Sequence, residues 1–402
     1  MKTRIAVWIA RVIVGLTFTV SGMAKMIDLY GSINKFNDYF AAWGIPDLFP
    51  EGLVIIAAAG LCMAEFLTGF TLMTGSMRRT SAICATAIMA IMLPLSAYIW
   101  IANPVSDCGC FGDWLIISNL ATFLKNILLT ALCIFLLRLN RTAPCLFAPW
   151  VQWMQITVAA AFCGLIGIIG YNEQPLIDFR PYPVGSMLYD PDPEAPEPVY
   201  VYRSLSTGET REFGMYDLPD DSDPDLEFIR VSQPDTNPVG INNFAILDPE
   251  TGDEITDQVI RTDSAQLFLL IPDLKAAGAA ISFNANELAT RNELIALTDA
   301  SADEIDAWRD ISMADYPIFR ADSRTLKTIA RGKTAIVSTA GGKIAWKRTL
   351  QSIDPETENL NIYASPSPFR RYTLIFLLIE AAILALGYLP RLLRSRTSPA
   401  KT

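Results

Sequence analysis

The sequence contains no histidine, and this absence excludes several common kinds of functional site. Without an imidazole there can be no Ser-His-Asp triad, no His-ligated haem and no HExxH zinc site. Charged residues are also scarce, at 18% of the 402 residues, whereas a typical soluble domain has about 25%. Any chemistry must therefore use thiols, carboxylates, lysine or a bound cofactor.

Apolar and polar residues are separated along the chain. Residues 5–171 form mostly long apolar runs, residues 172–369 are polar, acidic and proline-rich, and one more apolar run follows. The net charge of −10 comes mainly from the polar stretch, so nucleic acid is not an expected partner. The pattern predicts an α-helical membrane bundle in contact with lipid, together with a soluble α/β domain.

Six apolar runs are long enough to cross a bilayer, which takes about 20 residues. We predict spans at Ile5–Ile27, Leu53–Met73, Thr80–Ile101, Leu120–Leu137, Val151–Tyr171 and Tyr372–Leu389. Basic residues cluster at the N-terminus, in alternate loops and after the last run, whereas the other loops are acidic. The positive-inside rule then predicts a multi-pass protein of the cell inner membrane, with both termini cytoplasmic and residues 172–369 outside.

The first apolar run has a second interpretation. A positively charged start, an apolar stretch and the small residues around Gly22 and Ala24 also fit a cleaved signal peptide. Arg11 interrupts the stretch, which is long for such a peptide. Cleavage would leave the predicted orientation of the later loops unchanged, because their basic residues still determine it.

One polar loop carries two cysteines. Cys108 and Cys110 flank Gly109 in the predicted outer loop between the third and fourth spans, and residues 172–369 contain no cysteine. Two thiols one residue apart can close a small, strained disulfide ring, and glycine tolerates the backbone angles that this needs. Strain makes such a bond easier to reduce, which suits exchange. The loop therefore predicts a redox pair in an oxidising compartment.

Acidic residues beside this pair leave other interpretations open. Asp107 and Asp113 are expected to raise the pKa of the thiols, unless Lys125 or a helix N-terminus offsets them. The pair could be redox-active, could be a static disulfide that locks the turn, or could bind a metal ion with help from the aspartates.

Several segments of residues 1–140 resemble a known family. Phe18, Ser21, Gly22 and Lys25 fit the F-x-x-S-G-x-x-K signature of DoxX-like membrane proteins, and Ala64-Glu65 before Gly69 is similar to the same family. Cys108-Gly-Cys110-Phe-Gly-Asp113, followed by Thr122-Phe-Leu-Lys125-Asn126, resembles the MauE branch. That branch is associated with methylamine utilisation and with disulfide handling beside a thioredoxin-like partner. The resemblance implies a redox-associated membrane protein.

Lys25 and Glu65 are ionisable residues at or within the bilayer, where such groups usually face a bundle interior or a polar path. Lys25 could instead extend to the outer interface. Glu65 lies about four turns below the outer edge and could contact a quinone or join two helices. Glu380, in the last run, is at a comparable depth and could share that network. A quinone is the one cofactor that the sequence suggests.

The polar region divides into two parts. Residues 172–239 are expected to be an acidic, proline-rich linker with one hairpin, Val199–Leu205 and Thr210–Phe213. In residues 240–369 the sequence pattern predicts strands at 244–248, 265–272, 293–298, 317–322, 333–339 and 343–348. It predicts helices at 274–289, 301–308 and 323–331. Ser301 and Glu304 form a helix-capping signal.

This order of elements resembles a thioredoxin-like fold of the peroxiredoxin or TlpA type. The family would place Cys-x-x-Cys after the strand 265–272, but this chain has Ile271-Pro-Asp-Leu-Lys-Ala-Ala-Gly278 there. The resemblance therefore implies a thioredoxin-like domain that cannot exchange disulfides and that binds partners or acts as a structural cap.

The sequence supports two hypotheses of different classes. In the first, the bundle presents Cys108 and Cys110 to an extracytoplasmic thiol–disulfide partner and passes electrons to a membrane quinone near Glu65. In the second, the chain is a non-catalytic assembly scaffold that binds client proteins through the Cys-Gly-Cys loop and the degenerate domain. Whether the chain is an enzyme depends on which of these holds.

Overall fold

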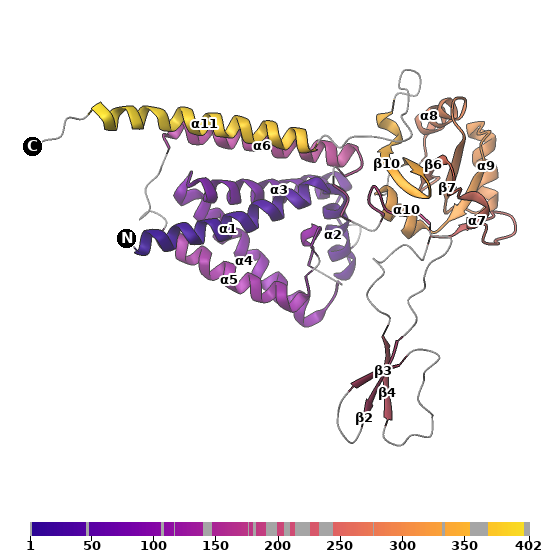
Figure 1. The fold of residues 1–402 in the computed structure, drawn as a ribbon, viewed down its shortest axis with the longest axis horizontal. Helices are drawn as coiled ribbons and strands as arrows, with labels where there is room; N and C mark the ends of the chain where they lie inside the picture. Colours follow the sequence, from indigo (N-terminus) through magenta and orange to yellow (C-terminus); the bar gives the residue numbers. More distant parts are fainter. Residues whose placement is uncertain are drawn as a thin grey trace, which may run out of the picture. The chain divides into compact units, whose positions relative to one another are not determined.

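The structure is a computed structural model that describes all residues except 1, 46–47, 106–107, 116, 140–146, 176, 180–181, 190–198, 205–209, 214–225, 233–243, 276, 332–333, 354–368 and 398–402. The chain divides into two compact units (Figure 1). Unit 1 comprises Met1–Arg180 and Pro366–Thr402, and unit 2 comprises Pro181–Ser365.

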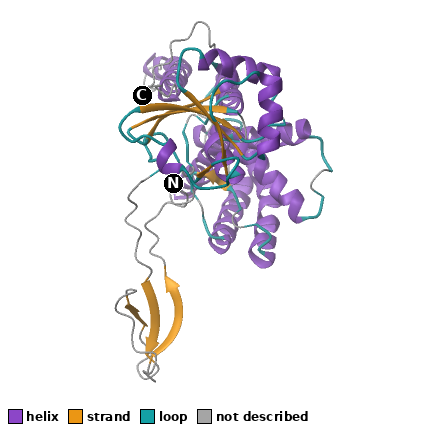
Figure 2. Ribbon diagram, turned by 90° about the vertical axis from the view of Figure 1, so that its right-hand side faces the viewer, coloured by secondary structure: helices purple, strands orange, loops and turns teal. Residues whose placement is uncertain are grey.

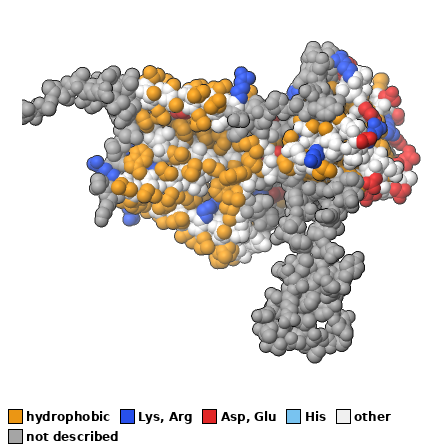
Figure 3. Space-filling view, viewed as in Figure 1, with side chains coloured by type: hydrophobic (Ala, Val, Ile, Leu, Met, Phe, Trp, Pro, Cys, Tyr) orange, Lys and Arg blue, Asp and Glu red, His pale blue; other side chains and the backbone are white. Residues whose placement is uncertain are grey.

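Unit 1 is a helical bundle. Its elements are α1 (Lys2–Ile27), α2 (Leu29–Ala42), α3 (Glu51–Thr74), α4 (Arg78–Ala102), the short strand β1 (Cys110–Asp113), α5 (Asn119–Leu139), α6 (Pro149–Asn172) and α11 (Phe369–Thr397). In Figure 3, apolar side chains cover much of the visible surface of these helices, as contact with lipid tails requires.

Five helices among the described residues are long and apolar enough to cross a membrane, namely α1, α3, α4, α5 and α6. They coincide closely with the first five predicted spans, so the membrane-bundle prediction is confirmed. The sixth predicted span, Tyr372–Leu389, lies within α11, which packs along α6 (Figure 1).

The helix α2 was not predicted. Its first turn is capped by Asp28, whose carboxylate accepts a hydrogen bond from the Gly31 amide at 3.1 Å. Leu29 and Ile33 are buried one turn apart and fix the inner face of the helix. This amphipathic helix follows α1 directly. Its side chains lie at the end of the bundle that the sequence predicts to be outside the membrane.

The helices α1 and α3 touch through their backbones. A Cβ atom on Gly69 would lie 2.3 Å from the Thr19 amide nitrogen, and one on Gly22 would lie 2.5 Å from the Phe66 amide nitrogen. Small residues allow such close approach, which favours helix association within a membrane. This contact sets the spacing between the two helices that carry Ser21, Lys25 and Glu65.

A leucine at Gly69 should destabilise the bundle. Gly69→Leu forces α1 and α3 apart, and we expect a loss of at least about 1–3 kcal/mol in the free energy of unfolding. Thermal melting in detergent would measure it. Gly60→Leu is the matched control, because Gly60 lies on the same helix, is exposed, and has open space around its Cβ position. Equal melting of the two variants would contradict the close crossing.

Unit 2 is a mixed α/β domain around a six-stranded sheet with the order β10-β9-β6-β7-β8-β5. The strands are β5 (Ile246–Leu247), β6 (Ala265–Ile271), β7 (Leu294–Thr298), β8 (Ile318–Ala321), β9 (Ala335–Ala340) and β10 (Lys343–Thr349). The helices are α7 (Thr256–Val259), α8 (Ala279–Ala289), α9 (Ala302–Ser312) and α10 (Ser323–Ala330), with a 3-10 turn at Leu350–Ser352. The pairs β6–β7 and β7–β8 are parallel, and the others are antiparallel.

Two hydrophobic layers enclose this sheet. Leu267 and Leu269 of β6 pack with α8 and α9, whereas the alternating residues Phe268 and Leu270 pack with α10 on the opposite face. Every residue of β7 is buried, as expected for a central strand covered on both sides. The α/β prediction for this region is confirmed, and Ser301 and Glu304 form the expected capping box on α9.

The predicted linker contains more structure than one hairpin. β2 (Val199–Ser204) and β3 (Thr210–Phe213) pair as predicted, but β4 (Leu226–Ser232) adds a third strand on the other edge of β2 (Figure 2). Tyr182 and Leu188, earlier in the same stretch, are buried in the core of unit 2.

Candidate functional site

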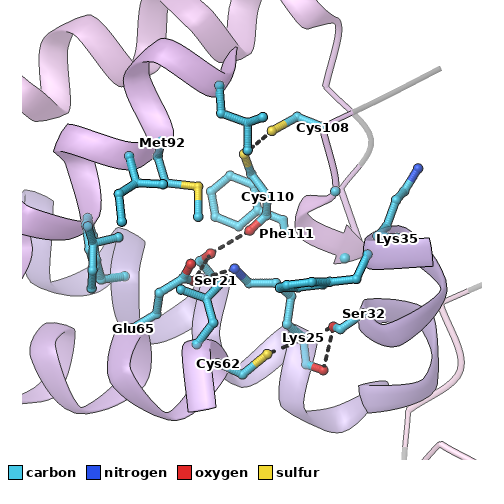
Figure 4. Close-up of a pocket in the computed structure, with 18 of the residues that line it drawn as sticks. Ser21, Lys25, Ser32, Lys35, Cys62, Glu65, Met92, Cys108, Cys110 and Phe111 are labelled. Atoms are coloured by element: carbon cyan, nitrogen blue, oxygen red, sulfur yellow. Dashed lines mark hydrogen bonds and ion pairs between the residues drawn. The ribbon is translucent and has the colours of Figure 1, made fainter. Parts of the chain in front are cut away.

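A cavity of about 520 Å³ lies inside unit 1 (Figure 4). Side chains from α1 to α5 and from the Cys-Gly-Cys loop line it, and most of them are apolar. Phe18, Phe36, Met92 and Phe111 supply parts of this wall. Two thiols and a buried ion pair also line the cavity, and they are the groups there that could take part in chemistry.

The two loop thiols face each other. The Sγ atoms of Cys108 and Cys110 are 2.8 Å apart, and both residues are present as free thiols. Gly109 between them has a left-handed φ of 65°, which a side chain would strain. The aliphatic part of Lys35 packs against this glycine, so that a Cβ atom there would lie 3.1 Å from Lys35 Cγ.

Two hydroxyl groups hold the backbone of the pair. Ser21 Oγ on α1 lies 2.5 Å from the carbonyl oxygen of Cys110, and the Tyr39 hydroxyl on α2 donates to the carbonyl oxygen of Cys108 at 3.0 Å. The loop is therefore fixed at both cysteines by groups from two different helices.

A buried ion pair lies beneath the loop. Lys25 Nζ is 2.5 Å from Glu65 Oε2, and the two side chains are 10% and 6% exposed. Ser21 Oγ lies 2.9 Å from the same carboxylate oxygen. Glu65 thus joins α3 to α1 and is connected to Cys110 through Ser21, whereas an extended, interfacial Lys25 is not found.

The surroundings of the two thiols shift their pKa values in opposite directions. The hydrogen bond between the two thiols lowers the pKa of Cys110, against the effect of burial, and the Lys125 and Lys25 cations lower it further. The same hydrogen bond and burial raise the pKa of the Cys108 thiol. Cys110 is therefore the thiol of the pair that loses its proton more readily, which suits it to act as the nucleophile.

Lys125 belongs to this electrostatic environment, with Nζ 4.4 Å from the centre of the Phe111 ring. Lys125 thus supplies the positive charge that the sequence analysis expected to offset the effect of the flanking aspartates on the thiol pKa. Asp113 ends β1, and Asp107 falls outside the described residues. Among the residues that the structure describes, no group of three or more potential ligands could hold a metal ion.

Sequence reasoning did not identify some of the residues at this site. Tyr39 and Lys35 lie on the unpredicted α2, and Cys62 lines the cavity as a buried thiol of α3 that lies 4.0 Å from Ser32 Oγ. The apolar spacing of α2 was the available signal for the first two. Glu380 lies on α11, where Gln155 of α6 is its polar neighbour, and it is not among the residues that line the cavity.

These helices define a multi-pass membrane protein. Residues 3–139 match the family model of the methylamine utilisation protein MauE. The match contains every residue that lines the cavity, including Ser21, Lys25, Glu65 and the Cys108–Cys110 pair. No curated protein and no solved structure matches the chain.

Proposed function

We propose that this protein is a membrane thiol–disulfide oxidoreductase that couples an extracytoplasmic protein thiol pair to a membrane quinone. The observation that carries the proposal is the placement of Cys108 and Cys110 in the wall of an apolar cavity within a helical membrane bundle. A membrane-soluble acceptor suits such a cavity, because ligand sites combine apolar walls with a few well-placed polar groups.

The exchange step begins with Cys108 and Cys110 joined as a disulfide. A partner thiolate attacks one of the two sulfurs and forms a mixed disulfide, and the second partner thiolate attacks the partner's sulfur in that bond. The partner leaves with a disulfide, and the pair gains two electrons and two protons as a dithiol. In the second step the dithiol passes two electrons and two protons to a quinone, which becomes a quinol, and the disulfide forms again.

The surrounding residues have distinct tasks in this proposal. Lys125 and Lys25 stabilise the Cys110 thiolate, which is the reactive form of the reduced pair. Ser21 and Tyr39 hold the loop backbone while the sulfur bonds change. At the cavity wall the Lys25 ammonium group can donate a hydrogen bond to a quinone oxygen, and the Glu65 carboxylate paired with it can accept one from the hydroxyl group of a quinol.

Unit 2 is proposed to bind the partner outside the membrane. The order β10-β9-β6-β7, with β6 and β7 parallel and β9 and β10 antiparallel, supports the thioredoxin-like prediction. The domain has no cysteine, so it cannot exchange disulfides itself. A scaffold that only assembles client proteins would use the same domain, and the redox behaviour of the loop distinguishes the two functions.

The quinone step can be tested with reduced protein in lipid nanodiscs under anaerobic conditions. We expect added decylubiquinone to be reduced, with one quinol formed for every two thiols lost. Cys108→Ser and Cys110→Ser should abolish the reaction, whereas Cys62→Ser is the matched control within the same cavity and should retain it. A pair that stays reduced in the presence of the quinone would contradict this acceptor. A pair that never changes its redox state would favour the scaffold.

A further inference from the structure

Unit 2 has a groove of about 590 Å³ between α8 and α9, at the edge of its packed core. Trp308 and Leu274 lie in its wall, and three large apolar residues beside it are strongly exposed: Phe283 at 58%, Ile311 at 83% and Met313 at 83%. Exposed apolar groups grouped around a groove mark an interaction site more often than scattered ones do.

We propose that this groove binds an extended segment of a partner protein that presents one large apolar side chain flanked by lysine or arginine. The groove is large enough for a bulky apolar side chain. Once that side chain is inserted, the exposed apolar residues of α8 and α9 would cover it. The proposal concerns recognition by unit 2 and does not depend on thiol exchange in unit 1.

Two polar groups in the groove are left without partners among the described residues. Asn286 Nδ2 donates to the Ser312 carbonyl oxygen at 2.7 Å, which fixes the orientation of the amide. The Asn286 Oδ1 and Ser312 Oγ atoms are buried and make no hydrogen bond, and Ser312 as a whole is only 7% exposed. Buried polar atoms without partners are costly.

The backbone at the end of α9 also favours display of an apolar side chain. Met313 has a left-handed φ of 56° at the C-terminal cap of the helix, a position that glycine usually occupies. Strained conformations of this kind are concentrated at functional sites. In this conformation the whole Met313 side chain is exposed to solvent beside the groove, where glycine would offer no side chain.

The charges around the groove determine the chemistry of the flanking residues. At the rim, Lys275 and Glu304 pair with each other at 2.8 Å, which leaves little net charge there. Asp303 and Asp310 are exposed on α9, next to the position of Ala307 in the groove wall. An excess of carboxylates favours a cationic segment and opposes binding to an anionic membrane surface.

Peptide selection on the full chain in nanodiscs tests this proposal. The probe is a phage-displayed library of random dodecapeptides, followed by titration of the selected peptide in synthetic form. We expect the selected sequences to contain one aromatic or large aliphatic residue between lysines or arginines. We expect Ile311→Asp to weaken binding of that peptide at least tenfold, and Asp303→Lys with Asp310→Lys to weaken it further as the attraction is lost.

Two variants separate binding from folding. Met313→Gly removes the apolar side chain but suits the left-handed backbone, so the fold should be at least as stable while peptide binding weakens. Val184→Asp is the control, because Val184 is 57% exposed on unit 2 and does not line the groove. An acidic consensus, or affinity unchanged by Ile311→Asp and Met313→Gly, would overturn the proposal. Loss of a dimer in Ile311→Asp, measured by light scattering, would instead assign the groove to a second copy of the chain.

Discussion

Cys110→Ser is expected to accumulate a covalent complex between Cys108 and a thiol partner in isolated membranes. Thiol–disulfide exchange is reversible, so the Cys108 thiolate can attack the disulfide of an oxidised partner and form a mixed disulfide that Cys110 would normally resolve. With Cys110 removed, Cys108 has no neighbouring thiol, and the Sγ–Sγ hydrogen bond that raises its pKa is lost. Non-reducing gels of membranes should show a new band that disappears on reduction, and redox turnover should be abolished.

The other cysteines provide controls for this experiment. Cys108→Ser should also trap a partner, through Cys110, because either member of the pair can form the mixed disulfide. Cys62→Ser and Cys163→Ser should trap nothing and should keep turnover, since both thiols are buried within the bundle. The redox proposal fails if neither loop variant gives an adduct and the wild-type pair never reacts with a thiol label after mild reduction.

Breaking the ion pair between Lys25 and Glu65 is expected to have the largest effect on stability. Glu65→Gln leaves the ammonium group buried without its counter-charge, and Lys25→Met leaves the carboxylate in the same state. Removal of one partner of a buried pair typically costs about 3–5 kcal/mol. Each single variant should therefore melt at a clearly lower temperature, or fail to accumulate as folded protein.

The double variant Lys25→Met with Glu65→Gln separates structure from function. It contains no unpaired charge, so stability should largely recover, because a buried ion pair can be replaced by neutral groups at little cost. The glutamine can still accept a hydrogen bond from Ser21. The Cys110 thiol then loses both the Lys25 cation, which lowers its pKa, and the Glu65 carboxylate, which raises it by a smaller effect. Thiol labelling of the recovered protein should therefore require a slightly higher pH than in wild type. Labelling at the wild-type pH would show that the pair as a whole does not change the pKa of Cys110.

The main elements were predictable because their signals are local. A run of about 20 apolar residues identifies a membrane helix without knowledge of its neighbours, and five such helices are present. Short apolar runs such as 265–272 and the capping residues Ser301 and Glu304 likewise identified the strands and α9 of unit 2. The helix α2 was missed because its polar residues suggested a loop, although Leu29, Ile33 and Phe40 follow helical spacing.

The site could be predicted only as separate pieces. Lys25 and Glu65 stood out as ionisable residues of membrane segments, and the two thiols stood out in a polar loop, but their contacts join distant parts of the chain. Ser21 meets Cys110 across 89 positions, and Tyr39 meets Cys108 across 69. Such contacts depend on the rotation and depth of packed helices, which hydropathy does not specify. A single sequence therefore does not determine them.

The close approach of α1 and α3 at Gly22 affects how substitutions in this protein would be interpreted. Gly22 follows Ser21, and its Cβ position presses against Phe66, the residue after Glu65. A single methyl group there would separate the two helices at the level where Ser21 and Lys25 reach Glu65. In a saturation scan selected on redox activity, Gly22 should thus score like a member of the active site, even though it contributes no functional group.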